Sequence, residues 1–137
     1  MKSRLRGVCG VKSMTRTEWE SYITRTYGAE GEYLWARYPN YAVFRHSENR
    51  KWFAVMMEIH KEKLGLPEGG MIEVLNLKCN PILIGSLRIE AGFFPAYHMS
   101  KTSWITVALD GSAEEEKIKW LLDLSYNLTL SGKKRRE

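Results

Sequence analysis

Residues 15–28 carry apolar and aromatic side chains three and four positions apart, the spacing of one face of an α-helix. Thr15 and Glu18 have the spacing of a capping box, in which each side chain binds the other residue's backbone amide. Gly28 can take the left-handed conformation that ends many helices. The pattern therefore predicts a helix whose buried stripe consists of Trp19, Tyr22, Ile23, Thr26 and Tyr27.

The middle of the chain changes to a period of two, which is the period of β-strands. This alternation predicts strands at residues 41–46, 52–59 and 71–77. Residues 47–49 are suited to a hairpin turn between the first two strands. In the second strand, alternation predicts one common face for Phe53, Val55, Met57 and Ile59.

Two stretches interrupt this pattern. Residues 30–40 are mixed in character, and Trp35 and Pro39 suggest a short edge strand followed by a turn. Residues 60–70 are polar and contain Pro67, so we expect a loop long enough to project from the sheet.

The second half of the chain predicts a short helix, a strand and a long helix. Asn80 and Pro81 predict the start of a helix. The asparagine side chain can cap the first backbone amides, and proline is tolerated in the first turn, where its missing N–H would have no partner in the helix. Trp104–Val107 reads as a central strand. Residues 112–115 have the spacing of a second capping box. The expected inward-facing residues are Leu83, Ile84 and Leu87, then Ile105, Val107 and Leu109, and finally Ile118, Leu121, Leu122, Ser125 and Leu128.

This order of elements predicts an α+β fold, an antiparallel sheet with helices packed on one face. The length of 137 residues fits one domain. No apolar run approaches the ~20 residues of a membrane span. With only two cysteines and no Cys/His pair at ligand spacing, we expect no disulfide framework, no metal and no cofactor, and a cytoplasmic location.

The charge is concentrated at the two ends of the chain. The net charge is +5, but residues 1–14 carry +4 and residues 131–137 carry +3, which leaves −2 for residues 15–130. We therefore expect a single domain at 15–130 between a basic, flexible N-terminal arm and a basic C-terminal tail, with Met14 as an alternative start. A uniformly basic DNA-binding surface is not expected.

The stretch P-A-Y-H-M-S-K-T-S-W-I-T-V within residues 93–107 resembles the signature of the MmcQ/YjbR family, which is close to P-x-Y-H-hydrophobic-N-K-x-H-W. Ser100 stands where the family usually has Asn, and Ser103 where it often has His. The resemblance covers roughly residues 15–128. Further family motifs follow in order at Lys51–Ala54, Leu64–Leu66, Leu77–Lys78 with Pro81, Leu121–Asp123 and Ser125–Tyr126.

The resemblance implies a small bacterial α+β domain with a role in DNA binding. Members of the family have been proposed to bind DNA through paired projecting hairpins, a double-wing arrangement. In this chain that role falls to the 45–52 hairpin and the loop that follows the next strand. The expected phosphate contacts are Arg45, Arg50, Lys51, Lys61 and Lys101. The alternative is that these charges form a solvated edge that protects strands from aggregation.

A second hypothesis is a pocket for a small ligand or a protein partner, built on the Tyr97–Lys101 loop. Its expected residues are Trp35, Tyr97, His98, Ser100, Lys101 and Trp104, with Lys101 as an anchor for an anion. Trp35, Tyr38, Tyr41, Phe93, Phe94 and Tyr97 would line a groove for a planar ligand or a peptide if several of them are exposed together. The alternatives are that these rings cover the core and that Tyr97 and His98 fasten the loop by hydrogen bonds.

The sequence does not predict an enzyme. Ser100 and Lys101 are adjacent, so in an extended loop they point to opposite sides and cannot form a dyad. His98 and Ser100 alone are a weak pair, and no carboxylate pair or phosphate-binding glycine loop is present. We expect a non-enzymatic module, monomeric or weakly dimeric.

Overall fold

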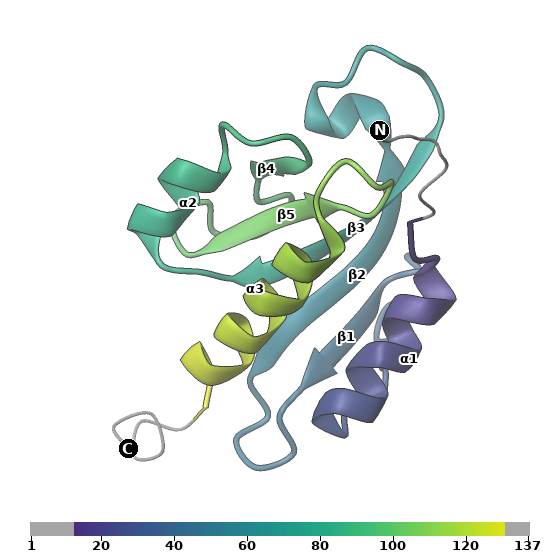
Figure 1. Ribbon diagram of the computed structural model, residues 1–137. Coiled ribbons are helices and arrows are strands. Elements are labelled where there is room, and N and C mark those ends of the chain that lie inside the picture. The colour runs from purple at the N-terminus through teal and green to yellow at the C-terminus, as the bar shows by residue number, and fades with distance from the viewer. Residues whose placement is uncertain (1–12, 131–137) are drawn as a thin grey trace.

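The computed structural model describes residues 13–130 as one five-stranded antiparallel sheet with order β1-β2-β3-β5-β4 and three α-helices (Figure 1). The predicted α+β class is confirmed. The predicted arm, apart from Ser13 and Met14, and the predicted tail lie outside the described residues. No helix in this range combines the length and the apolar character that crossing a membrane requires. In chain order the elements are α1 (Arg16–Tyr27), β1 (Ala42–Arg45), β2 (Trp52–His60), the 3-10 helix η1 (Lys61–Leu64), β3 (Met71–Lys78), α2 (Pro81–Leu87), β4 (Phe93–Pro95), β5 (Trp104–Ala108) and α3 (Glu115–Leu128).

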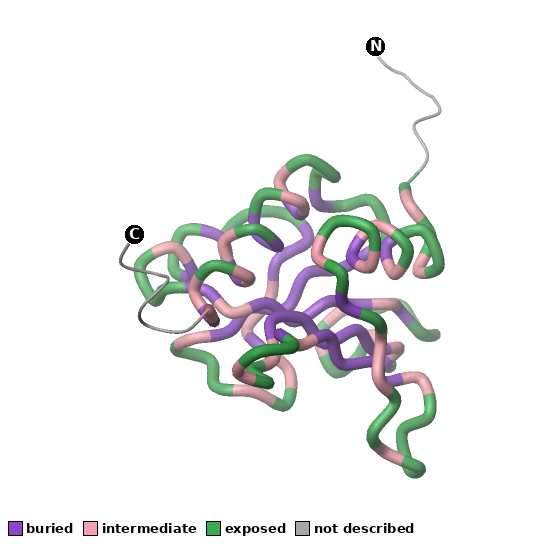
Figure 2. Tube along the Cα trace, turned by 90° about the horizontal axis from the view of Figure 1, so that it is seen from below, coloured by how far each residue is buried: buried purple, intermediate pink, exposed green. Residues whose placement is uncertain are grey.

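All three α-helices pack on one face of the sheet, as predicted (Figure 1). Trp19 of α1, Ile84 of α2 and Leu121 of α3 meet in a single apolar core. Ile105 and Val107 of β5 face the same core, which confirms the predicted inward face of that strand. Figure 2 shows the buried residues gathered in the strands and on the inner sides of the helices, with exposed loops around them.

Loops, and no described α-helix, cover the opposite face of the sheet. Val43, Val55, Met57 and Val74 form a second apolar cluster there. The partly buried side chains that pack against this cluster come from residues 35, 52, 64, 66, 94, 97 and 99. The side chains of these loops therefore shape the surface of this face.

A β-bulge overturns one prediction. Phe44 pairs with Ala54, but Arg45 pairs with Trp52, so Phe53 is an extra residue in β2. Phe53 therefore packs in the helix-facing core, whereas Val55 lies on the loop-covered face. The prediction that Phe53 and Val55 share a face was wrong. The extra residue shifts the alternation by one position, so residues before and after the bulge no longer follow one pattern.

β5 is internal, but it is not the middle strand. It lies between β3 and the three-residue edge strand β4, and β3 occupies the centre. The apolar residues of Trp104–Val107 led to the prediction of a central strand. Any strand that has a neighbour on both sides and is covered on both faces is equally apolar, so this pattern does not identify the middle strand.

The helix ends agree with the sequence where the signals are local. The Thr15 hydroxyl accepts from the Glu18 amide at 3.2 Å and the Glu18 carboxylate accepts from the Thr15 amide at 2.8 Å, which confirms the capping box. Asn80 caps α2 by accepting from the Leu83 amide at 2.8 Å, also as predicted. Thr26, however, is exposed.

The second capping box does not form. α3 begins at Glu115 after Glu114. The Ser112 hydroxyl instead donates to the Asp110 carboxylate at 2.6 Å, in a turn that precedes the helix. Leu128, predicted to be buried, is half-buried. Among residues 30–40, the predicted edge strand is reduced to a single bridge between Glu32 and Val43.

Candidate functional site

A buried polar pair on the sheet fixes the loop that follows β4. Asn76 of β3 and Thr106 of β5 are paired and fully buried. The Asn76 amide donates to the Tyr97 carbonyl at 2.8 Å, and the Tyr97 amide donates to the Thr106 hydroxyl at 2.9 Å. The Thr106 hydroxyl in turn donates to the Asn76 side-chain oxygen at 2.5 Å. The loop is therefore fastened through its backbone at Tyr97, which leaves the Tyr97 ring available to shape the surface.

The rest of this loop closes on itself. The Lys101 ammonium donates to the Ala96 carbonyl at 3.0 Å, and the Trp104 amide donates to the Ser100 carbonyl at 3.0 Å. His98 has a left-handed backbone, with φ of 65°, and its exposed ring lies 4.0 Å from the Tyr97 ring. One of the three N–H donors of the Lys101 ammonium is thus used within the loop.

An aromatic pocket of about 270 Å³ opens on the loop-covered face. Trp35 meets Trp52 edge-on, with ring centroids 5.7 Å apart, and meets Tyr41 in the same way at 6.0 Å. Tyr38 stacks on Tyr41 at 4.8 Å. None of the described lining residues is Lys, Arg, Asp or Glu, so the pocket suits an uncharged planar group. Its lining residues are Trp35, Tyr38, Tyr41, Trp52, Val55, Met57, Asn76, Tyr97, His98 and Met99.

Burial controls the ionisation of Tyr41 in this wall. Removal of the phenol from water raises the pKa of Tyr41 to about 12, with further contributions from Tyr97 and Tyr38. At neutral pH the Tyr41 hydroxyl is therefore protonated. A hydrogen bond with the Tyr97 side chain contributes to this rise in the pKa of Tyr41 and links the two rings of the wall.

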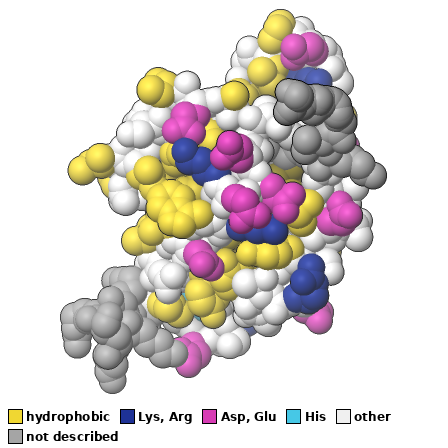
Figure 3. All heavy atoms as spheres, viewed as in Figure 1, with side chains coloured by type: hydrophobic (Ala, Val, Ile, Leu, Met, Phe, Trp, Pro, Cys, Tyr) yellow, Lys and Arg dark blue, Asp and Glu magenta, His cyan; other side chains and the backbone are white. Residues whose placement is uncertain are grey.

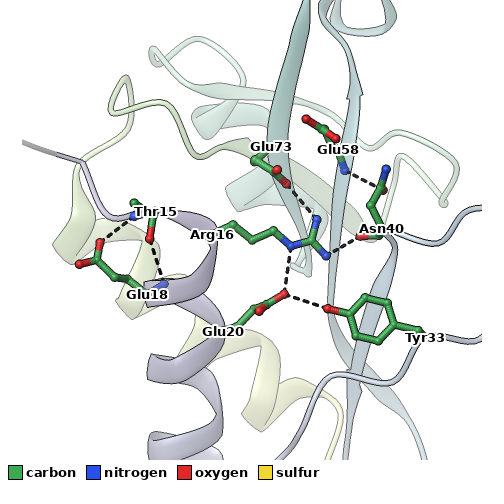
Figure 4. Close-up of polar contacts among 8 residues, drawn as sticks. All are labelled: Thr15, Arg16, Glu18, Glu20, Tyr33, Asn40, Glu58 and Glu73. Atoms are coloured by element: carbon green, nitrogen blue, oxygen red, sulfur yellow. Dashed lines mark hydrogen bonds and ion pairs between the residues drawn. The ribbon is translucent and has the colours of Figure 1, made fainter.

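The segment that carries Trp35, Tyr38 and Tyr41 is anchored to α1 and β3 through Arg16 (Figure 4). Arg16 pairs with Glu73 of β3 at 3.0 Å and with Glu20 at 3.0 Å, and it also donates to the Asn40 carbonyl. Burial raises the pKa of Glu73, and the Arg16 charge opposes that rise.

A second hollow, the basic groove, adjoins the aromatic pocket at one end of the sheet. It encloses about 350 Å³ and is lined by Arg50, Lys51, Trp52, Lys78, Trp104, Leu128 and Thr129. The Lys78 ammonium lies over the Trp104 ring, 5.6 Å from its centroid. Trp52 lines both the groove and the aromatic pocket. Three cations and two indoles are therefore gathered in one hollow.

Hydrogen bonds from α3 fix the geometry of the groove. The Ser125 hydroxyl donates to the carbonyl of the bulged residue Phe53 at 2.5 Å and accepts from the Lys78 amide at 2.9 Å. Thr129 contacts His46 at 2.7 Å and accepts from the Asn49 side chain at 2.9 Å. The end of α3 is thus joined to the hairpin turn and to the strands β2 and β3.

The structure divides the five predicted phosphate contacts. Arg50 and Lys51 lie in the basic groove. Arg45 is bound to the Glu32 carboxylate through two nitrogens, at 2.7 and 3.2 Å, so its charge is largely neutralised. Lys61 follows the far end of the 9-residue strand β2, roughly 30 Å from the hairpin turn at the rise per residue of a strand. Lys101 lies in the turn before β5, at the groove's end of the sheet.

The structure therefore does not bring all five residues together on one surface. Successive turns of antiparallel strands lie at opposite ends of the sheet, so the β1–β2 hairpin and the β2–β3 connection do not form a pair on one side (Figure 1). The prediction also missed Lys78, which joins the groove only because β3 pairs with β5.

The six predicted pocket residues divide in the same way. Trp35, Tyr97 and His98 line the aromatic pocket, and Ser100 and Lys101 are not among its lining residues. Trp104 lines the basic groove instead. Of the other aromatic candidates, Tyr38 and Tyr41 join the pocket, Phe93 packs in the helix-facing core, and Phe94 packs against the cluster on the loop-covered face. Trp52 and Asn76 were missed.

The helix-bearing face is a poor candidate for a cationic surface. Figure 3 shows acidic and basic side chains intermingled over the helices on that face. Lys117 pairs with Glu90 at 2.7 Å, and Lys119 pairs with Glu115 at 2.9 Å. Within residues 13–130, no three His, Cys, Asp or Glu side chains converge closely enough to hold a metal ion.

Known proteins resemble this chain along most of its length. The profile of the YjbR family matches residues 14–128. YyaQ of Bacillus subtilis (strain 168), an uncharacterised protein, is 40% identical over 116 residues, which are 85% of this chain and 98% of YyaQ. A crystal structure of a Pseudomonas syringae protein is 42% identical with a TM-score of 0.84, and the match covers 85% of this chain and 100% of that one.

A more distant likeness supports the fold alone. A crystal structure of a Deinococcus radiodurans protein has 22% identity and a TM-score of 0.65, over 87% of this chain and 80% of that one. The profile match covers nearly the range over which the sequence motifs resemble the family. This chain belongs to the YjbR family.

Proposed function

We propose that this protein is a non-enzymatic, cytoplasmic DNA-binding module that holds phosphates in the basic groove. The observation that carries the proposal is the convergence of Arg50, Lys51 and Lys78 in one hollow with Trp52 and Trp104. Lysine and arginine contacts to phosphate supply most of the affinity of nucleic-acid binding proteins, and indoles offer surfaces for bases. Among the described residues that line the groove, no carboxylate opposes the three cations.

The sequence carries further positive charge after α3. α3 ends at Leu128, which lines the groove together with Thr129. The chain then continues with Lys133, Lys134 and two arginines. Each cation that contacts phosphate releases counterions, so the basic residues that follow α3 would raise affinity at low salt.

The serine and the lysine of the Tyr97–Lys101 loop both make bonds within that loop. The Ser100 hydroxyl is paired with the Thr102 hydroxyl at 3.0 Å, and the Lys101 ammonium is bound to the Ala96 carbonyl. These contacts support a structural role for both side chains in the Tyr97–Lys101 loop, and not a role in catalysis.

A second candidate function is binding of a small planar ligand, and the aromatic pocket favours it. Its walls are rings set at large angles to one another, around a space without formally charged lining residues. A thermal-shift screen with uncharged heteroaromatic compounds tests this candidate. A hit must lose its stabilising effect in Tyr38→Ala, because Tyr38 is 43% exposed at the pocket and its removal spares the core.

The decisive experiment for the DNA-binding proposal is a salt-titrated anisotropy measurement with the full chain and a labelled oligonucleotide. The test variant is Lys51→Gln/Lys78→Gln, because glutamine keeps part of the apolar stem while removing the charge. The control is Lys61→Gln/Lys63→Gln, which has the same net charge but lies at the far end of β2.

We expect the groove variant to bind at least tenfold more weakly, and its log affinity to fall less steeply with log salt by about 0.7–0.9 per lost contact. The control should bind like the wild type. Equal losses in both variants, or no binding by the wild type at low salt, would reject the groove as a phosphate site.

A further inference from the structure

We infer that the aromatic pocket receives one unstacked base of a single DNA strand whose phosphates lie in the basic groove. The inference rests on the proposed function and makes it specific, since it predicts a preference for single strands. It also gives Trp52 a defined place, between the base and the phosphates.

The two hollows are arranged in the order that a nucleotide requires. Lys78 pairs with Trp104 at the groove. Two residues earlier in β3, Asn76 pairs with Thr106 below the pocket. Two residues of a strand span about 6.6 Å, which is within the reach of one nucleotide between its phosphate and its base. Trp52 lines both hollows, so the path from one to the other crosses a single indole.

The pocket's chemistry suits a base rather than a charged group. Trp35 and Tyr41 stand nearly perpendicular to each other, with an interplanar angle of 79°. Every nucleobase has a π-face that stacks on such rings, and stacking tolerates any base. The exposed His98 side chain adds a polar group at the rim of the pocket.

Two unusual backbone conformations mark the same two hollows. Within residues 13–130, Arg50 and His98 are the non-glycine residues with positive φ, at 64° and 65°. Arg50 lines the groove and His98 lines the pocket. Such conformations persist only where surrounding contacts hold them, and they are frequent at binding sites.

A paired base must leave the duplex before it can enter this pocket. In a duplex each base is stacked and bonded to its partner, and bringing it out costs the unpairing energy. The geometry therefore favours single strands, whose bases turn outward more easily.

The test compares a labelled oligothymidylate with a duplex of equal length, on the full chain, in the wild type and two variants. Tyr38→Ala removes a pocket ring that is 43% exposed, so the fold should survive. Tyr33→Ala is the matched control, because Tyr33 is 55% exposed and is not among the pocket's lining residues. An oligouridylate arm distinguishes DNA from RNA as the source of the base.

We expect the wild type to prefer the single strand by at least tenfold. Tyr38→Ala should lose at least fivefold in single-strand affinity with an unchanged salt slope, because loss of stacking removes no ionic contact. Tyr33→Ala should bind like the wild type. A 2-aminopurine placed in the strand should be quenched by the wild type and less so by Tyr38→Ala.

Two failures are distinguishable. If the wild type binds neither strand nor duplex at low salt, the proposed function fails and the inference fails with it. If strand and duplex bind equally and Tyr38→Ala matches the wild type, the groove remains a phosphate site and the base pocket is refuted. Tighter binding of oligouridylate than of oligothymidylate would overturn DNA as the ligand.

Discussion

The Asn76 side chain, fully buried on β3, donates a hydrogen bond to the backbone carbonyl of Tyr97 at 2.8 Å. This bond fastens a surface loop to the middle of the sheet, where an apolar residue would normally lie. The polar pair of Asn76 and Thr106 is therefore best understood as part of the site, because its bonds determine where Tyr97 and His98 lie.

Replacing Thr106 with valine should separate this role from simple packing. Valine has nearly the same shape, but it leaves the Tyr97 amide and the Asn76 oxygen without their bonds. The expected cost is about 1–3 kcal/mol of unfolding free energy, measured by urea denaturation. Thr102→Val is the control, since Thr102 is exposed. A double-mutant cycle with Asn76→Leu should show a coupling energy of at least 0.5 kcal/mol. Additive effects would contradict a shared network.

Ser125 satisfies backbone groups that the bulge in β2 leaves outside the ladder. Its hydroxyl donates to the Phe53 carbonyl and accepts from the Lys78 amide. Ser125→Ala should therefore cost about 1–3 kcal/mol, whereas Ser86→Ala on the exposed side of α2 should stay within about 0.5 kcal/mol. Calorimetric unfolding of both variants measures the difference. A cost for Ser125→Ala as small as that of Ser86→Ala would show that the bulge does not need this support.

Local signals in the sequence were sufficient for much of the fold. The capping residues Thr15 and Asn80 act within three residues of themselves, so their spacing predicts the helix starts. The bulge at Phe53 could not be predicted in this way, because it depends on the register with β1 and on Ser125 from α3. The reversal of alternation followed from that one residue.

The site was predictable only in part, for a related reason. Arg50 and Lys51 were identified because they flank a turn that the sequence shows. Lys78 reads as the polar end of a strand, and its place beside Trp104 depends on the pairing of β3 with β5. The pairing of Arg45 with Glu32 was not evident from the sequence, because Glu32 comes from a separate segment.

Arg50 allows a test that separates binding from stability. Its φ of 64° is costly for any residue with a Cβ, by about 1–2 kcal/mol, and glycine avoids that cost. Arg50→Gly should therefore stabilise the fold relative to Arg50→Ala by about 1 kcal/mol, while both variants lose the same phosphate contact. Urea denaturation and anisotropy on the same preparations measure the two effects. Unequal losses of affinity would mean that the turn's conformation, and not the charge, governs binding.

Arg16 should influence stability in a pH-dependent way. Burial holds the pKa of Glu73 above its ordinary value of 4.5, and Arg16 limits that rise. For a carboxyl with a raised folded-state pKa, stability is fully present below the unfolded pKa and falls as pH rises through the folded one. Arg16→Met removes the opposing charge, so the pKa of Glu73 should rise further.

The cost of Arg16→Met should therefore be larger at neutral pH than below pH 4.5, reaching about 1–3 kcal/mol. Urea denaturation at the two pH values measures it, with Arg16→Met/Glu73→Gln as the companion variant. In that companion the extra cost at neutral pH should shrink. A cost that is the same at both pH values would place the role of Arg16 in its bonds to Glu20 and Asn40 instead.

Tyr41 predicts how the fold responds to alkali. The pKa of its phenol is raised from 10.0 to about 12, chiefly by burial in the aromatic pocket. Below pH 10 the phenol is protonated in both the folded and the unfolded chain, so its contribution to stability is complete. Between pH 10 and about 12 the unfolded chain loses the proton first, and stability falls. Tyr41→Phe removes this term, so its unfolding free energy should fall less steeply over that interval, as measured by urea denaturation.

The remaining slope should include Tyr27, whose pKa is also raised, by burial and by its bond to Asp123. If wild type and Tyr41→Phe lose stability in parallel above pH 10, the Tyr41 phenol is not held in a water-poor wall, and the pocket is more open than its lining residues indicate.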